Sequence, residues 1–267
     1  MTAAVQLTGI TTQFGQSPIH DQLDLTINRG EMLSLIGGSG TGKSVMLRIM
    51  AGLMKPHQGR VQLMGVDLHA KQPEPGSNAA MPEIGVLFQG GALFTSLTVS
   101  ENIQLAIAAR HKLSNSLLKE LAAMKISLVG LPCEAGAKLP AELSGGMVKR
   151  AALARALALD PAIIFLDEPT AGLDPIGANS FDELIETLRA HLNLTVVMIT
   201  HDIDSLKRLS DRVAVLLDKK AKTGTFDEIA SLDHPWVQRY FGGVRGRAAG
   251  LSEPQHSSSN RKAKDHG

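Results

Sequence analysis

The sequence has few cysteines, few aromatic residues and no long apolar run. Its single cysteine, Cys133, excludes an intrachain disulfide and is typical of a reducing compartment. No stretch approaches the roughly 18 apolar residues of a membrane-spanning helix. Residues 1–15 lack the basic region and apolar core of a signal peptide. We therefore expect a soluble cytoplasmic protein, which a partner must hold if it works at a membrane.

Charge of either sign is not in excess. The net charge of +1 gives no reason to expect a nucleic-acid partner or an acidic binding surface. Apolar residues, by contrast, make up 43% of the 267 residues. That content is sufficient for one large domain or for a core with a subdomain.

Short apolar runs alternate along the chain with segments of helical spacing. Strands that alternate with helices favour an α/β fold whose mostly parallel sheet is covered by helices on both faces. The expected strands are residues 32–36, 84–88, 162–166, 195–200 and 212–217, and the expected helices follow residue 43 and cover 148–159 and 179–191.

Other segments do not follow the strand–helix order. In residues 1–30 and 59–67, polar and apolar residues take turns around turn signals, which predicts a small antiparallel β-subdomain. Residues 92–160 contain the helices of an expected inserted helical subdomain. We interpret residues 72–80 as a loop and residues 244–267 as a basic, disordered tail.

A glycine-rich turn separates the first expected parallel strand from a helix. Its pattern, G-x-x-x-x-G-K-[ST], is that of a phosphate-binding loop, in which glycines let backbone N–H groups converge on a polyphosphate. The positive end of the helix dipole adds to the attraction. Lys43 can bridge the outer phosphates and Ser44 can offer its hydroxyl to Mg²⁺; the alternative is a glycine-rich turn that binds nothing. The loop comprises Gly37, Gly38, Ser39, Gly40, Thr41, Gly42, Lys43 and Ser44.

Two carboxylates end the apolar strand at residues 162–166. Because open α/β sheets bind ligands at the carboxyl ends of their strands, Asp167 and Glu168 should face the phosphate-binding loop. Asp167 is placed to hold magnesium and Glu168 to polarise an attacking water. A solvated strand end is the alternative.

These motifs and several others occur in the order found in ABC-type ATPases, which the chain resembles over about residues 5–232. Leu143-Ser-Gly-Gly-Met147 resembles the family signature LSGGQ, with Met147 in place of glutamine. The resemblance also matches Gln89 of VLFQ to the Q-loop, Asp174 of AGLDP to the D-loop, His201 of VMITHD to the switch histidine and Phe14 of QFG to the aromatic that stacks on adenine.

The resemblance implies ATP and Mg²⁺ as ligands and a P-loop NTPase core. It implies that Ser44, Gln89 and Asp167 serve the metal, and that Glu168, His201 and Gln89 act in hydrolysis. In the family, two subunits pair head to tail around ATP. The signature of one subunit, Ser144, Gly145 and Gly146, with Asp174 nearby, then completes the site whose phosphates are held by the other subunit.

The chain is further similar to the ATPases of MCE-associated Mla lipid transporters, which move phospholipids between the two membranes of bacteria. The segments on which this resemblance rests are LFQGGALFTSLTVSENI, LSGGM and DHPWVQRYFGG. This resemblance implies an integral-membrane permease, an MCE lipid-binding protein and a small STAS-domain protein as partners, on the cytoplasmic side of the inner membrane. Residues 89–96 would receive a short helix of the permease.

Residues 233–243 predict a short C-terminal helix with Asp233 as its cap and Pro235 in its first turn. Trp236 and Tyr240 would be i, i+4 neighbours. The helix either packs on its own domain or docks on another protein.

Three other functions stay open on the sequence alone. The same machine could move amino acids or peptides, the chain could be an ATP-binding scaffold without turnover, or it could be a nucleic-acid-linked ATPase. Glu168 and His201 disfavour the scaffold, and the net charge disfavours nucleic acid.

Overall fold

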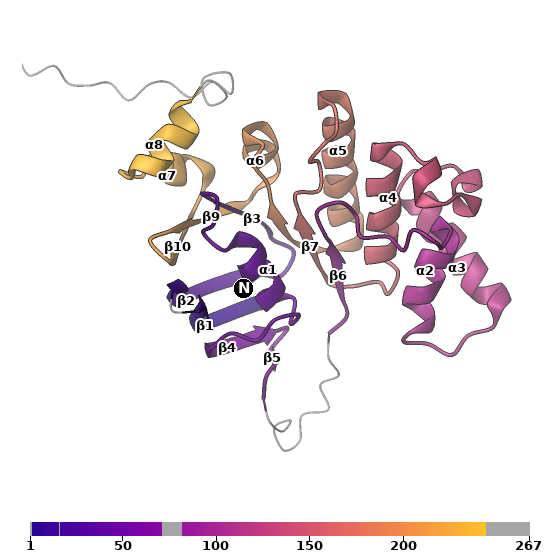
Figure 1. The fold of residues 1–267 in the computed structure, drawn as a ribbon, viewed down its shortest axis with the longest axis horizontal. Helices are drawn as coiled ribbons and strands as arrows, with labels where there is room; N and C mark the ends of the chain where they lie inside the picture. Colours follow the sequence, from indigo (N-terminus) through magenta and orange to yellow (C-terminus); the bar gives the residue numbers. More distant parts are fainter. Residues whose placement is uncertain (1, 16, 71–81, 244–267) are drawn as a thin grey trace, which may run out of the picture.

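The described chain, which in this computed structural model comprises residues 2–15, 17–70 and 82–243, contains two β-sheets (Figure 1). The loop expected at 72–80 and the tail expected at 244–267 lie outside these residues. The larger sheet is parallel except at β10, and each of its five expected strands is confirmed to within one residue at either end. Its order is β10 (Lys220–Gly224), β9 (Arg212–Leu217), β3 (Met32–Gly37), β8 (Thr195–Ile199), β7 (Ile163–Asp167) and β6 (Ile84–Leu87).

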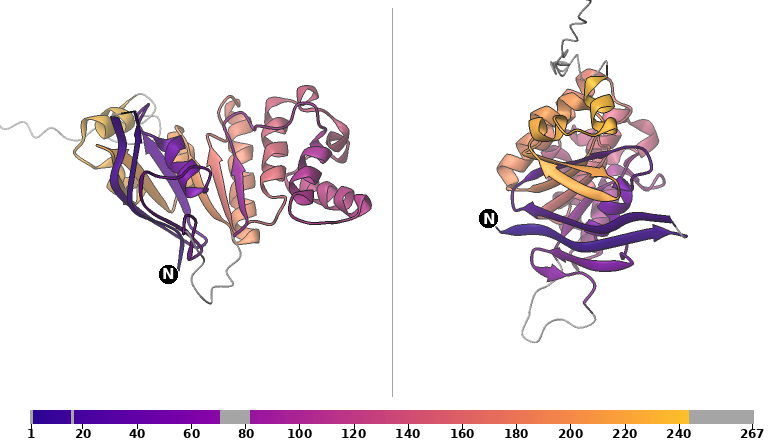
Figure 2. Two further views of the ribbon diagram at one scale, coloured as in Figure 1. Left: turned by 60° about the horizontal axis from the view of Figure 1, so that its bottom comes forward. Right: turned by 90° about the vertical axis from the view of Figure 1, so that its left-hand side faces the viewer.

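The smaller sheet is antiparallel, as predicted from the alternating residues near the N-terminus. Its long strands β1 and β2 cross the side of the molecule (Figure 2, right). Helix α1 (Lys43–Met50) packs between the two sheets, because its apolar face belongs to the same core cluster as Leu33 and Leu35 of β3 and Val5 of β1. The strands are β2 (Ser17–Asn28), β1 (Ala3–Phe14), β4 (Gln58–Leu63) and β5 (Val66–Asp67).

Beyond β6, helices form the end of the molecule opposite the small sheet (Figure 2, left). Thr98 and Glu101 form a reciprocal capping box that begins α2. The members are α2 (Val99–Ala108), α3 (Asn115–Leu128), the 3₁₀ turns Cys133–Ala137 and Pro140–Glu142, and α4 (Gly145–Ala156). Within the described residues, no helix is both long and apolar enough to cross a membrane.

Two helices begin earlier than the sequence pattern predicted. Helix α4 starts at Gly145 rather than 148, and α5 (Pro175–Leu192) starts well before residue 179. In each case the side chain of the residue before the helix caps it. The Ser144 hydroxyl accepts a hydrogen bond from a backbone N–H in the first turn of α4, and the Asp174 carboxylate does so in α5. The expected starts are therefore wrong because the apolar periodicity begins one turn after the caps.

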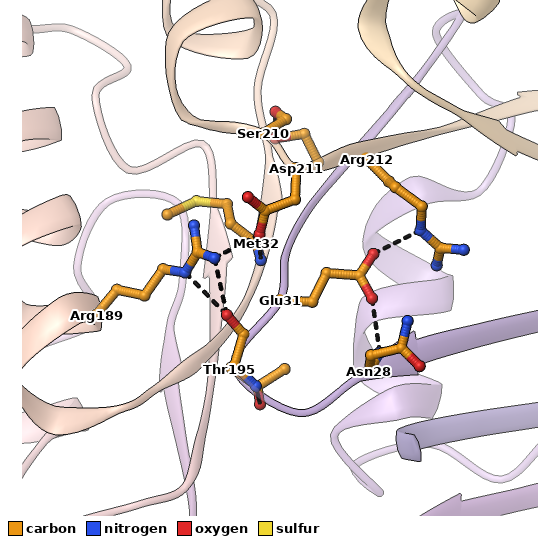
Figure 3. Close-up of polar contacts among 10 residues, drawn as sticks. Asn28, Glu31, Met32, Arg189, Thr195, Ser210, Asp211 and Arg212 are labelled. Atoms are coloured by element: carbon orange, nitrogen blue, oxygen red, sulfur yellow. Dashed lines mark hydrogen bonds and ion pairs between the residues drawn. The ribbon is translucent and has the colours of Figure 1, made fainter. Parts of the chain in front are cut away.

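A polar network joins the elements at the edge where the parallel strands begin (Figure 3). Glu31 Oε1 accepts from Arg212 Nε at 2.6 Å. Arg189 of α5 pairs with Asp211, whose carboxylate also accepts the N–H of Met32 at 2.8 Å. These contacts join the starts of β3 and β9 to the end of α5, so this edge has a structural role.

The remaining helices, α6 (Ile203–Leu209), α7 (Phe226–Ala230) and α8 (Pro235–Gly242), cover the strands β3 and β9. Val237 and Phe241 of α8 are buried in this cluster, so α8 packs on its own chain. The expected cap is wrong, because His234 Nδ1 rather than Asp233 accepts the first-turn N–H, at 3.1 Å.

Candidate active site

The phosphate-binding loop connects the end of β3 to the start of α1. Gly42 caps the helix with φ of 88°, a left-handed conformation that favours glycine. A Cβ there would also lie 2.3 Å from Ile19 Cγ2 and 2.7 Å from His20 Nε2. Glycine at this position is thus required by both the backbone and its neighbours, and it brings the loop close to β2.

Lys43 folds back over the loop that precedes it. Its Nζ donates to the carbonyl oxygens of Gly37 and Gly38 at 2.9 and 3.0 Å. Burial lowers the pKa of Lys43, while the charges of Glu168 and Asp167 oppose that shift. The ammonium is therefore held at the mouth of the loop, beside two acidic residues.

Ser44 and Asp167 meet across the gap between α1 and β7. Ser44 Oγ lies 3.4 Å from Asp167 Oδ1. Asp167 is only 7% exposed, and burial raises the pKa of its carboxyl, with the Ser44 hydrogen bond opposing. A hydroxyl and a buried carboxylate are hard oxygen donors of the kind that Mg²⁺ prefers, so the pair fits the ion that the sequence predicts.

Glu168 is held between two polar side chains that follow the ends of β6 and β8, the strands on either side of β7. Gln89 Nε2 donates to Glu168 Oε2 at 2.8 Å, and His201 Nε2 lies 3.1 Å from Oε1. Glu168 has φ of 50°, a strained conformation of the kind that clusters at functional sites. The structure thus brings together the three residues predicted to act in hydrolysis.

Lys149 is a neighbour of Glu168 that the sequence reasoning missed. It lies on α4, is only 6% exposed, and its Nζ donates to the backbone oxygen of Glu168 at 3.3 Å. Burial lowers the pKa of Lys149, and the charges of Glu168 and Asp167 oppose this. The signal available in the sequence was a lysine in the expected helix, two residues before the apolar run Ala-Ala-Leu-Ala.

Ser144 and Asp174 line a second region, a groove of about 570 Å³. Gly146 and Met147 also border this groove, and so does Ile176, whose side chain is 82% exposed. Gly145 and Gly146 form the first turn of α4. The loop residues 37–44 belong to the other region, so the predicted nucleotide-contacting residues fall into two sets.

Phe14 and the remaining loop residues complete the predicted set. Phe14 ends β1 opposite Ser17, and its stacking on adenine stays a prediction. Thr41 Oγ1 donates to the carbonyl of Gly38 at 2.9 Å, which closes the tip of the loop over Ser39 and Gly40.

A model of the ABC transporter family matches residues 20–171, a segment that runs from β2 past Glu168. This chain belongs to the ABC transporter family. Asp174 and His201 lie beyond the matched segment, so their assignment rests on motif order and on the contacts described above.

Three relatives of this ABC ATPase carry two different names. A Mycobacterium tuberculosis protein named probable ribonucleotide transport ATP-binding protein mkl is 36% identical, over 97% of this chain and 72% of its own length. The intermembrane phospholipid transport system ATP-binding protein MlaF of Haemophilus influenzae is 36% identical over 84% and 85%. MlaF of Escherichia coli K12 is 34% identical over 90% and 89%.

Solved ABC cassettes have the same fold. The dimeric cassette MJ0796 bound to ADP and phosphate superposes with a TM-score of 0.72 at 30% identity, covering 83% of this chain and 98% of that one. A second dimeric structure of MJ0796 gives 0.71. The expected α/β ABC fold is confirmed, and this ABC ATPase is an ATP-hydrolysing member of its family.

Proposed function

We propose that this chain is the ATP-hydrolysing motor subunit of a transporter that moves phospholipids between the inner and outer membranes of bacteria. The observation that carries the motor role is Glu168, held by Gln89 and His201 at the strand end beside Lys43. The names of the Haemophilus influenzae and Escherichia coli relatives support the phospholipid substrate.

The phosphate-binding loop binds ATP in this proposal. Backbone N–H groups of residues 37–44 and the start of α1 face the phosphates, and Lys43 leaves the loop carbonyls to reach the outer ones. Ser44, Asp167 and Gln89 would serve the Mg²⁺. The ion, when bound, neutralises charge that develops on the transferred phosphoryl group.

Glu168 orients the attacking water and accepts its proton. His201 contacts the γ-phosphate and links it to Glu168, and Gln89 senses both the metal and the water. Their contacts in this structure, 2.8 Å to Gln89 and 3.1 Å to His201, support this arrangement because they fix both carboxylate oxygens. General-base roles of this kind contribute about 10²–10⁴ in rate.

Two copies of the chain are needed for a complete site. The groove with Ser144 and Asp174 supplies a second helix N-terminus, at which Gly145 and Gly146 leave the amides of α4 uncovered by a Cβ. In an ATP-sandwiched homodimer this groove faces the γ-phosphate held by the other copy. The dimeric cassettes of similar fold support the arrangement.

A membrane permease docks at residues 89–96. Phe94 in this segment is 54% exposed, and its backbone is fixed by Asn102, whose side chain accepts from Phe94 N at 2.8 Å and donates to Phe94 O at 3.1 Å. An apolar side chain on a rigid loop suits a short amphipathic helix. The permease then holds the motor on the cytoplasmic side of the inner membrane, together with an MCE protein and a STAS-domain protein.

A different cargo is the alternative, since the mycobacterial relatives are named for ribonucleotides and the motor chemistry would serve amino acids or peptides equally well. Purification of the full chain from membranes, with mass spectrometry of bound proteins and lipids, tests the proposal. A permease with phospholipid and an MCE protein is expected. Subunits of an amino-acid or nucleotide permease would overturn the choice of cargo.

A further inference from the structure

Helix α8 touches the phosphate-binding loop through its tryptophan. A Cβ on Gly38 would lie 3.1 Å from Nε1 and 3.4 Å from Cδ1 of Trp236, so the pyrrole edge of the indole lies against the loop backbone. The indole also stacks on Tyr240, with 4.7 Å between ring centroids. Because Val237 and Phe241 anchor α8 in the core, the indole is supported by a fixed helix.

The loop segment beneath the indole is the one that holds Lys43. Gly37 pairs with Leu216 of β9 in the sheet, and a Cβ on Gly37 would lie 3.2 Å from the carbonyl oxygen of Leu216. Gly38 is covered by Trp236, and the carbonyls of both glycines accept from Lys43 Nζ. The first turn of the loop is therefore fixed by β9 at one residue and by α8 at the next.

We propose that Trp236 is a positioning residue that keeps the phosphate-binding loop in the conformation that receives ATP. A loop ordered in advance binds its ligand without a further ordering cost. Without the indole, Gly38 must be ordered when ATP binds, so affinity falls. The carboxylate of Glu168 is held by Gln89 and His201 instead, so turnover at saturating ATP is retained.

The test measures KM, kcat and equilibrium ATP binding on the full chain. Trp236→Ala is expected to raise KM and Kd for ATP about three- to tenfold, because one ordered contact is lost. Its kcat should stay within about twofold of the wild-type value. Trp236→Phe keeps a ring to stack on Tyr240 and should give a smaller rise. Gln238→Ala, on an exposed position of the same helix, is the matched control and should change neither.

A double-mutant cycle separates direct contact from general damage. Gly38 does not adopt a left-handed φ, so Gly38→Ala is opposed chiefly by the indole. Its effect on ATP affinity should be large in the wild-type chain and small in the Trp236→Ala chain. Equal effects in both chains, wild-type KM and Kd in Trp236→Ala, or parallel losses of kcat and affinity would each overturn the proposal.

The chain has one tryptophan, which gives a readout independent of turnover. Titration of the intact protein with ATP and Mg²⁺ should change the emission of Trp236, because the nucleotide fills the loop under the indole. The change should saturate at the Kd measured by calorimetry. Emission that stays constant at saturating ATP would contradict the placement of Trp236 on the loop.

Discussion

The ammonium of Lys149 lies 3.3 Å from the backbone carbonyl oxygen of Glu168. This contact joins the helix that carries the signature Ser144 at its start to the backbone of Glu168, the residue predicted to orient water. In the proposed homodimer, α4 would thus touch one nucleotide at its N-terminus and the other site through Lys149. Through α4, the binding of one nucleotide would therefore be coupled to the position of Glu168 at the other site.

Lys149→Met is expected to lower kcat about 10- to 100-fold with little change in KM for ATP. The reason is that a charged hydrogen bond worth about 1.5–3 kcal/mol no longer holds the strained backbone of Glu168. Steady-state ATPase assays check this, with the exposed Lys119→Met as the control. A wild-type kcat in Lys149→Met would show that the contact does not position Glu168.

Stability is expected to fall as the pH is lowered from about 6.5 to about 4, because of His20. This side chain is fully buried beside Gly42 and is paired with Thr12 Oγ1 at 2.6 Å, and burial lowers its pKa to about 4. In that window the unfolded chain takes up a proton that the folded chain does not. The free energy of unfolding should therefore fall by about 3 kcal/mol across it.

Urea denaturation between pH 4 and pH 7.5 measures this loss. His20→Gln keeps a polar group beside Thr12 and cannot titrate, so its unfolding free energy should fall less over the same range. Identical pH dependence in the two proteins would mean that His20 takes its proton equally well when folded.

Phe241→Ala is expected to destabilise the protein by about 3 kcal/mol. Phe241 is 4% exposed and makes edge-to-face contacts with Phe226 and Tyr240, at 5.4 and 5.0 Å between centroids. Thermal and urea unfolding check the value, with the exposed Arg239→Ala as control. A chain cut after residue 232 should lose still more stability, whereas a helix that served only for docking would leave it unchanged.

Local motifs could be predicted from the sequence, and contacts between distant segments could not. The loop from Gly37 to Ser44 and the pair Asp167 and Glu168 depend on residues adjacent in the chain, and their strand contexts follow from apolar runs. Lys149 and Trp236 meet the site only because α4 and α8 pack where they do. No spacing in the sequence records that packing.

The same distinction explains the errors at the helix ends. Ser144 and Asp174 were recognised as members of motifs, but their capping of α4 and α5 extends each helix beyond its apolar pattern. Strand β10 was missed because its residues, Lys220–Gly224, are mostly polar and pair only with β9 at the sheet edge. Edge strands often carry charged side chains that discourage pairing with another chain, and Lys220 and Lys222 fit that pattern.

Glu168→Gln is expected to lower kcat by about 10²–10⁴ and to trap the ATP-bound homodimer. The amide cannot accept the proton of water, yet Lys43 and the loop still bind ATP, so the closed state accumulates. Size-exclusion chromatography with light scattering should show a dimer with ATP and Mg²⁺ and a monomer without nucleotide.

The matched control for this dimer is Glu168→Gln combined with Ser144→Glu. The added carboxylate lies at the start of α4, where the other copy's γ-phosphate would sit, and like charges repel there. The double variant should therefore bind ATP with unchanged affinity and remain monomeric, because its own loop is intact. A dimer that still forms in the double variant would show that the signature groove does not face the nucleotide of the second copy. A monomer in Glu168→Gln at saturating ATP would refute the sandwich for the isolated subunit.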